Sequence, residues 1–399
     1  MSGEKYLTAT EAAALLGVSV ATLYVYVGRK GLRSRPVPGS RERRYLRADI
    51  EQELLRRNTP RSAAADPPLE SSITQITDQG HFYRGQSAIE LSKAATLEDV
   101  AALLWQTSAE QVFADEVPKS SAHYDALASE LKSLNSVDRA TALLHVLEEA
   151  NPRSFDLTPE GMARTGADII RWLSAILLQR SAPATTPIHE VVANALNLDD
   201  SRADLARRLL ILSADHGLEP GAKAVRAVAS TGVSPWRSVT AGLLVASGRR
   251  NWFGYGLDVW QLLGEILDGP DAKEPIFRRL RQGQYVPGFE SSLYAGHDPR
   301  GRALLVSCEK AFPNDPDIER LNTAVALVRE WSDREPDFPF ARAFANRKLG
   351  VGQSDALYSL ARSTGWIAHA IEQYTQDDRR RTGNDRASMF GSMMPHHST

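Results

Sequence analysis

The chain has 399 residues, enough for two or three domains, and its 42% hydrophobic content marks a globular protein rather than a disordered one. It carries neither an apolar run long enough to span a bilayer nor a signal-peptide pattern at its start, so we expect a cytoplasmic protein without a membrane anchor. The single cysteine, Cys308, excludes an intramolecular disulfide, cannot by itself build a thiolate metal site, and is expected to be buried.

The formal net charge of −2 is divided unevenly along the chain. Residues 1–60 contain 11 Lys and Arg against 6 Asp and Glu, a balance of +5 that leaves −7 for the remainder. This pattern indicates a basic head attached to an acidic body. We expect the head to span residues 1–58, a Pro-containing linker without periodicity residues 59–70, and the body residues 71–399.

The first predicted elements are two short helices joined by a glycine turn, in "YLTATEAAALLGVSVATLYVYVGRKGL". Thr8 or Thr10 is placed to cap the first helix and Ser19 the second. A third amphipathic helix is expected near Arg47, after a turn within a cluster of arginines. This stretch resembles the winged helix-turn-helix of excisionase and MerR-type heads, with the arginine-rich hairpin as the wing.

The resemblance implies that the head binds DNA. The residues that would face the groove are Ala21, Thr22, Tyr24 and Tyr26. The residues that would meet phosphates are Arg29, Lys30, Arg33, Arg35, Arg41, Arg43 and Arg44. The alternative is a solvated basic surface on a small helical protein-interaction module. Helical pattern and charge agree here, which favours DNA.

Helical periodicity prevails from Ile73 onward, because apolar residues recur three and four positions apart in segment after segment. Alternating, strand-like runs are scarce, and one short hairpin is expected around residues 73–83. The predicted fold class is therefore mainly α, with a winged helix-turn-helix followed by an all-helical body.

Four ordered segments of the body carry a resemblance to citrate synthase over essentially all of residues 71–399. They are "ITDQGHFYRGQSAIELSKAATLEDVAALLW", "LLILSADHGLEPGAKAVRAVASTGVSPWRSVTAGLLVASG", "VPGFESSLYAGHDPRGRALL" and "SLARSTGWIAHAIEQY". The resemblance implies a homodimer with a large and a small domain, the small one at about residues 252–350. It also implies the tricarboxylic acid cycle acyltransferase reaction between acetyl-CoA and oxaloacetate, with no tightly bound cofactor.

The family holds the oxaloacetate carboxylates with a histidine and arginines, since a guanidinium fits a carboxylate in two-pronged fashion. His216 in "SADHGLE" matches that histidine, and an ordinary helix-end histidine is its other reading. Arg300 in "HDPRGR" and Arg362 in "LARSTGW" match two of the arginines, each otherwise a surface ion-pair partner. The remaining arginine position falls on Asn384 in the closest register, and the nearby candidates are Arg379, Arg380, Arg381 and, as the one carried into the site, Arg386.

The proton-handling residues depart from the family pattern. The enol-stabilising histidine falls on Asn251 and the ketone-protonating histidine on Ser291, which follows Glu290 where the family has glycine. Asp337 in "REPDFPFARAF" is the best match for the catalytic base, with a helix N-cap as its competing role. His297, the only histidine nearby, is expected to be exposed in a variable loop.

The rate losses that are typical of such replacements predict weak catalysis. An asparagine amide at 251 can still donate to an enolate oxygen, but a lost general acid typically costs about 10²–10⁴-fold in rate. A lost oxyanion donor costs a comparable factor.

Three functions compete on this sequence. The favoured one is a transcriptional regulator whose body senses a di- or tricarboxylate or an acyl-CoA, with little citrate synthase activity. The second is an active citrate synthase or a related enzyme that condenses an acyl-CoA with an oxoacid, with Glu290 and Asp337 as acid and base. The third is a structural scaffold with a decaying site.

Overall fold

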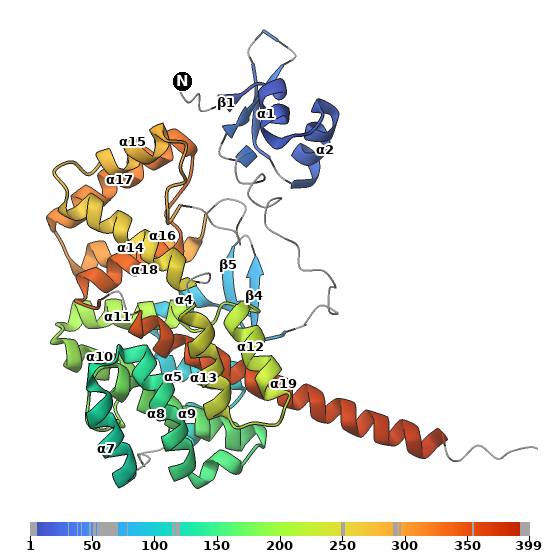
Figure 1. Ribbon diagram of the computed structural model, residues 1–399, viewed down its shortest axis with the longest axis vertical. Helices are drawn as coiled ribbons and strands as arrows, with labels where there is room; N and C mark the ends of the chain where they lie inside the picture. The colour runs from blue at the N-terminus through green and yellow to red at the C-terminus, as the bar shows by residue number, and fades with distance from the viewer. Residues whose placement is uncertain are drawn as a thin grey trace, which may run out of the picture. The chain divides into compact units, whose positions relative to one another are not determined.

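The computed structural model describes residues 6–391 apart from 31, 38, 41, 48, 51–52, 54–70, 78, 114–115, 117–119, 249–251, 290–293, 295–296 and 353–354. At positions 25, 28–30, 122, 252–254 and 380–391 it describes the backbone and not the side chains. The chain divides into two compact units (Figure 1). One comprises residues 1–69, 261–298 and 314–340, and the other comprises residues 70–260, 299–313 and 341–399.

The head begins with two capped helices. Helix α1 (Ala9–Leu16) starts at a capping box, in which the Thr8 hydroxyl accepts from the Glu11 N–H and the Glu11 carboxylate accepts from the Thr8 N–H. Helix α2 (Val20–Lys30) starts after Ser19, whose hydroxyl accepts from the Thr22 N–H at 3.1 Å. Of the two predicted caps for the first helix, the structure selects Thr8. Gly17, at φ 63°, makes the left-handed turn that joins the helices.

A three-stranded antiparallel sheet backs these helices. Its strands β1 (Tyr6–Leu7), β2 (Ser34–Pro36) and β3 (Arg43–Leu46) are arranged in the order β1-β3-β2, so β2 and β3 form the expected hairpin. Helices and sheet share one apolar core, made of Leu7, Ala12, Ala13, Leu16, Leu23, Leu32, Tyr45 and Ile50. The head therefore has the predicted winged helix-turn-helix arrangement.

The second unit opens with a small antiparallel sheet of β4 (Thr74–Thr77), β5 (Gly80–Tyr83) and β6 (Gln86–Ser87). The hairpin predicted around residues 73–83 is confirmed. Successive side chains of a strand point to opposite faces, and in β5 this leaves His81 and Tyr83 buried and Phe82 partly exposed.

The remaining regular elements of the described body are helices, as predicted. In chain order its helices are α4 (Ala88–Ala94), α5 (Leu97–Trp105), α6 (Ala109–Val112), α7 (Ala122–Glu130), α8 (Ser136–Ala150), α9 (Pro159–Leu177), α10 (Ile188–Leu196), α11 (Asp200–Ser213), α12 (Pro220–Ala229), α13 (Pro235–Ala246), α14 (Trp252–Asp268), α15 (Glu274–Arg281), α16 (Pro299–Ala311), α17 (Pro316–Ser332), α18 (Phe338–Lys348) and α19 (Ala356–Gly391), with 3₁₀ turns η1 (Leu131–Ser133) and η2 (Pro152–Phe155). Among the described residues, no helix combines the length and the apolar character that a bilayer crossing needs.

Helix α19 is central to its unit. It packs against α5, α9, α11, α12 and α13 (Figure 1). The approach to α13 is close enough to require glycine, because a Cβ on Gly242 would lie 2.5 Å from Cδ2 of Trp366. Arg362 and His369, both fully buried, therefore lie inside the core of this unit rather than on its surface.

The first unit holds the C-terminal part of α14 together with α15 and α17. Arg279 of α15 pairs with Glu265 at 2.7 Å, and Arg320 of α17 donates to the Ile266 carbonyl at 2.9 Å. These contacts fall within the predicted small domain at about residues 252–350. Its boundaries stay a prediction. Cys308, on α16 in the second unit, is buried as expected.

Candidate functional site

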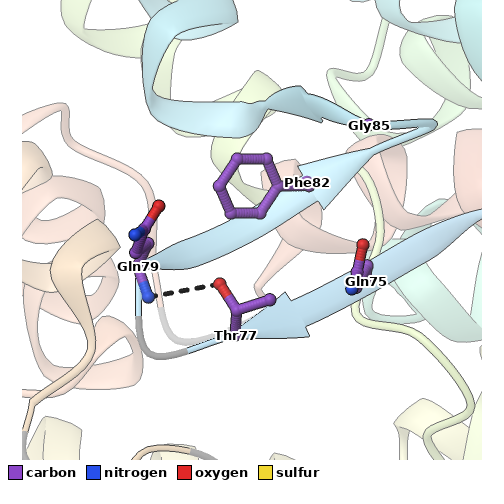
Figure 2. A pocket seen from close by; sticks show the side chains of 5 residues that line it. All are labelled: Gln75, Thr77, Gln79, Phe82 and Gly85. Atoms are coloured by element: carbon purple, nitrogen blue, oxygen red, sulfur yellow. Dashed lines mark hydrogen bonds between the residues drawn. The ribbon is translucent and has the colours of Figure 1, made fainter.

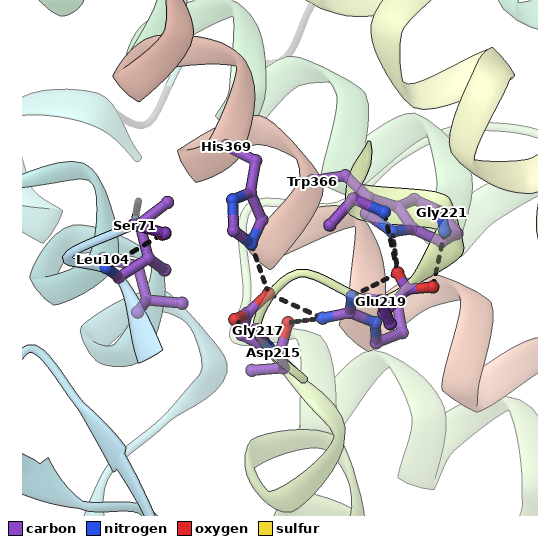
Figure 3. A network of polar contacts seen from close by, with 12 residues as sticks. Ser71, Leu104, Asp215, Gly217, Glu219, Gly221, Trp366 and His369 are labelled. Carbon is purple, nitrogen blue, oxygen red and sulfur yellow. Dashed lines mark hydrogen bonds and ion pairs between the residues drawn. The ribbon is translucent and has the colours of Figure 1, made fainter. Parts of the chain in front are cut away.

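A buried network of charged side chains centres on Arg362 of α19, which pairs with Asp215 and Glu219. Both acidic residues are labelled in Figure 3. Nη1 of Arg362 lies 2.7 Å from Oδ1 of Asp215, and its Nη2 lies 2.6 Å from Oε1 of Glu219. Trp366, one turn further along α19, donates its Nε1–H to the same Glu219 oxygen at 3.2 Å. Two carboxylates thus fix the orientation of one guanidinium.

The segment between α11 and α12 supplies both carboxylates. Glu219 also caps α12, because its oxygens accept from the N–H groups of Gly221 and Ala222. Asp215 accepts from the Gly217 N–H at 2.8 Å, and its Oδ1 lies 3.3 Å from Nε2 of His369 (Figure 3). The two acidic side chains therefore order the turn and the helix start while they hold Arg362.

Helix α19 meets this segment at Gly365. The Gly365 N–H donates to the Ala214 carbonyl at 3.1 Å, and a Cβ at Gly365 would lie 2.6 Å from that same oxygen. It would also overlap the Asp215 carboxylate. Only glycine lets the helix approach this closely.

Arg300 of α16 contacts His216 in the same segment. Its Nη1 lies 3.2 Å from Nδ1 of His216 and 3.4 Å from the Leu212 carbonyl, and both side chains are buried. A guanidinium has no acceptor, so Nδ1 must be the acceptor, and a neutral His216 carries its proton on Nε2. The histidine therefore presents an N–H donor, which is the group that a carboxylate ligand requires.

Strand β5 adds a second buried histidine to the site. The rings of His81 and His216 lie 5.0 Å apart, centroid to centroid, with a tilt of 35°. Tyr83, on the same face of β5, donates its hydroxyl to the Ile211 carbonyl at 3.0 Å and accepts from the Asp215 N–H at 3.3 Å. The sheet thereby fixes the end of α11 and the segment that carries His216.

The electrostatics of the network follow from burial and from the arginines. Burial, and then the charges of Arg300 and Arg362, hold the pKa of His216 well below its ordinary value. Burial, Arg300 and His216 lower the pKa of His81 in the same way, so both rings are neutral at pH 7. Burial opposes the ionisation of Asp215, but His369 and Arg362 outweigh it and hold the pKa of Asp215 well below its ordinary value.

The structure brings together three of the four predicted substrate-binding residues, His216, Arg300 and Arg362, in the second unit. His216 contacts Arg300, and its chain neighbour Asp215 pairs with Arg362. Sequence reasoning missed four further members of the network, which are His81, Asp215, Glu219 and His369. Asp215 and Glu219 are visible as the acidic residues of "SADHGLE", whereas the burial of His81 and His369 depends on how strand and helix pack. Within the described part of the chain, no three His, Cys, Asp or Glu side chains are arranged to hold a metal ion.

A separate open hollow of about 390 Å³ lies beside the same small sheet (Figure 2). Its lining consists of Gln75, Thr77, Gln79, Phe82 and Gly85. Phe82 is adjacent to His81 in β5 and so points to the opposite face. The hollow is therefore lined by none of the charged residues of the Arg362 network.

Comparison with protein-family models matches residues 66–382 to the citrate synthase C-terminal domain. The chain belongs to the citrate synthase family. Residues 6–58 match a helix-turn-helix domain, so the citrate-synthase-like body carries an N-terminal helix-turn-helix head.

Two curated relatives show how far the similarity extends. Citrate synthase 2 of Bacillus subtilis is 22% identical over 358 residues, which cover 80% of this chain and 93% of that protein. Citrate synthase of Haloferax volcanii is 28% identical over 176 residues, which cover 43% of this chain and only 46% of that protein.

A solved structure shares the fold. It is the ternary complex of carboxymethyl coenzyme A and oxaloacetate with citrate synthase from Thermoplasma acidophilum. The similarity has a TM-score of 0.63 and 16% sequence identity, and covers 77% of this chain and 90% of that one.

Asp337, the residue that best matches the citrate synthase base, lies in the first unit. Its Oδ1 accepts from the Phe340 N–H at 2.9 Å, and its own N–H donates to the Gly288 carbonyl at 2.8 Å. This is an N-cap contact at the start of α18, the role that competed with catalysis. The function as base stays a prediction. His297 is exposed, as expected.

The remaining predicted catalytic positions, Asn251, Glu290 and Ser291, lie outside the described residues. The backbone of Arg386 is helical within α19, and its side chain lies outside the described part of the chain. The roles assigned to these four residues stay predictions.

On α2 of the head, the four predicted groove-facing residues differ in exposure, and Ala21 is exposed. Tyr24 is 56% exposed, whereas Tyr26 is half-buried and packs against the core of the head. Thr22 is half-buried, and its hydroxyl lies 2.9 Å from that of Ser19. Of the three polar side chains among the four, Tyr24 is the best placed to reach a ligand of the head.

The residues predicted to contact phosphates also differ in exposure. Arg43 and Arg35 are exposed on the hairpin, Arg43 donating to the Ser34 hydroxyl at 2.9 Å and Arg35 lying 3.7 Å above the Tyr6 ring. Arg33 instead pairs with Asp49 at 3.0 Å, which gives it a structural task within the head. Arg44 is half-buried. The side chains of the other three basic residues lie outside the described residues, and these are Arg29, Lys30 and Arg41.

Proposed function

We propose that this member of the citrate synthase family is a DNA-binding transcriptional regulator whose body senses a di- or tricarboxylate, or an acyl-CoA, with little citrate synthase activity. The observation that carries the proposal is the meeting of His216, Arg300 and Arg362 in one buried network. A neutral histidine with an Nε2–H and two guanidiniums have the chemistry that binds carboxylates. Oxaloacetate, a component of the Thermoplasma ternary complex, is the first ligand to try.

Low activity is proposed because the sequence lacks both histidines that handle protons in the family. Asn251 and Ser291 occupy their positions in the alignment. A serine hydroxyl is a poor acid at neutral pH, and a lost general acid typically costs about 10²–10⁴-fold in rate. The chain thus keeps candidate carboxylate-binding residues but lacks the two histidines that transfer protons in the family.

The homodimer that the family resemblance implies gives a mechanism by which ligand binding changes DNA binding. A homodimer would present two heads to two related half-sites, as dimeric helix-turn-helix proteins do. A ligand that closes the body and changes the spacing of the heads would have a different affinity for the DNA-bound and the free protein, which is what a switch needs.

The proposal is tested by measuring CoA thiol release from acetyl-CoA and oxaloacetate with the full chain, and thermal stabilisation by oxaloacetate and citrate in the same samples. We expect stabilisation without turnover at ordinary enzyme rates. Turnover of about 1–10³ s⁻¹ that Asp337→Asn abolishes would instead make the protein an enzyme. Absence of both signals would favour the scaffold. Ligand-dependent binding to a DNA library then tests the regulatory half.

The second candidate is an active citrate synthase or a related enzyme that joins an acyl-CoA to an oxoacid. The meeting of His216, Arg300 and Arg362 supports it, because enzymes of this family hold the oxaloacetate carboxylates with a histidine and arginines. Glu290 and Asp337 would then supply acid and base, and the single variants Glu290→Gln and Asp337→Asn should each lower the rate.

A further inference from the structure

A third buried arginine, Arg342 of α18, lies in the same unit as Arg300 and Arg362. Its side chain is 2% exposed, within the apolar run "FPFARAFA". Its Nη2 lies 2.7 Å from Oδ2 of Asp355, and its guanidinium lies 3.9 Å from the centroid of the Tyr358 ring. Burying a guanidinium is costly even when it is paired, so packing alone gives this position no reason to be arginine.

Helix geometry connects Arg342 to the Arg362 network. Tyr358 and Arg362 are four residues apart on α19, so their side chains lie on one face and their Cβ atoms are about 5–6 Å apart. Because Arg342 stacks on Tyr358, its charge lies beside the charge of Arg362. Arg342 is also close to His216. After burial and the charges of Arg300 and Arg362, the charge of Arg342 further lowers the pKa of that histidine.

Arg342 also lies near the first turns of α14. A Cβ on Gly256 would be 3.9 Å from Nη2 of Arg342 and 4.0 Å from Oδ2 of Asp355. A guanidinium at this place suits an anionic group, whereas an uncharged ligand group offers no charge to pair with it.

We propose that Arg342 is a specificity-determining residue that makes the His216 site prefer a tricarboxylate to a dicarboxylate. Two carboxylates of the ligand bind His216, Arg300 and Arg362, and the third replaces Asp355 on Arg342. Burial raises the pKa of Asp355, so its ionised form is less stable here than in water, which favours its replacement on the guanidinium by a ligand carboxylate. The inference rests on the proposed function, because it assumes that the network binds carboxylates.

The test is calorimetric titration of the full chain with citrate and with 3-hydroxyglutarate, which is citrate without its central carboxylate. We expect wild-type protein to bind citrate at least 10-fold more tightly. Arg342→Gln should weaken citrate at least 10-fold and change 3-hydroxyglutarate less than about 2-fold, since a charge-assisted hydrogen bond contributes about 1.5–3 kcal/mol. The control is Arg302→Gln, an exposed arginine of α16, which should change neither affinity.

A second variant guards against unfolding. Arg342→Lys keeps the charge and should keep part of the preference for citrate, with a melting temperature near that of the wild type. Equal affinity of the wild type for both ligands, or an equal loss of both in Arg342→Gln, overturns the role of Arg342 and leaves the proposed function standing. Failure of the wild type to bind citrate, 3-hydroxyglutarate and oxaloacetate removes the proposed function and this inference with it.

Discussion

Arg362 and Asp215 form an ion pair at 2.7 Å in which neither side chain has any exposed surface. Such a pair gives little net stability over an apolar pair, because both charges lose their hydration. The pair does fix the Arg362 guanidinium inside the core, beside Asp215, which directly precedes His216 in the chain. We therefore interpret the pair as a means of positioning the proposed binding site, and its removal should affect both stability and ligand binding.

Substitution of Arg362 should strongly lower the free energy of unfolding. Arg362→Gln leaves Asp215 and Glu219 without their guanidinium, and removal of one partner of a buried pair typically costs about 3–5 kcal/mol of unfolding free energy. Urea denaturation measures this loss. Arg302→Gln, on the exposed face of α16, is the matched control and should stay within about 0.5 kcal/mol of the wild type. Similar values for the two variants would contradict the structural role of Arg362.

The close approach at Gly365 gives a second prediction. Gly365→Ala inserts a methyl group where the Ala214 carbonyl and the Asp215 carboxylate lie, so α19 or the segment must shift. Overpacking of this kind typically costs about 1–3 kcal/mol. We expect reduced thermal stability and loss of stabilisation by carboxylates. Gly352→Ala is the control, because a Cβ there meets no atom within 4 Å. Equal behaviour of both variants would argue against the tight crossing.

The buried histidines predict a loss of stability on mild acidification. The pKa values of His81 and His216 are lower in the folded protein than in the unfolded chain, so the unfolded state binds more protons below its own pKa of about 6.5. Stability should fall from pH 7 to pH 5, by up to about 1.4 kcal/mol per pH unit for each ring. Glu98, Asp168 and Asp355, whose pKa values burial raises, act in the opposite direction.

Urea denaturation at pH 7.5, 6 and 5 measures this dependence, and His81→Gln isolates one ring. The variant should lose less stability between pH 7 and pH 5 than the wild type. An unchanged slope would mean that His81 has the same pKa in the folded and in the unfolded protein.

The head makes a prediction about salt. Arg43 is exposed on the β2–β3 hairpin, whereas Arg33 is paired with Asp49. Arg43→Gln should weaken DNA binding across sequences and reduce the slope of log K against log salt by about 0.9, the value for one lost phosphate contact. Arg33→Gln should mainly lower the melting temperature of the head. Fluorescence anisotropy at several salt concentrations separates the two, and an unchanged slope in Arg43→Gln would remove the hairpin from the DNA contact.

The sequence predicted those features that depend on local patterns. Ser19 and Thr8 at the helix starts, the hairpin in residues 73–83 and the helical body follow from capping, alternation and periodicity. His216, Arg300 and Arg362 came from ordered motifs, which place residues on a known framework. Arg342 and His81 could not be predicted, because their burial depends on which surfaces of distant elements meet. An arginine in "FARAFA" looks like the polar side of a helix until Tyr358 and Asp355 are placed beside it.

The central claim is that the buried network binds carboxylates, and calorimetric titration of the full chain with oxaloacetate tests it most directly. We predict saturable binding by the wild type and by Arg302→Gln, and a loss of about 10- to 100-fold in affinity for Arg300→Gln, whose guanidinium contacts His216. Equal binding by Arg300→Gln and the wild type, or no binding by the wild type, would contradict the account.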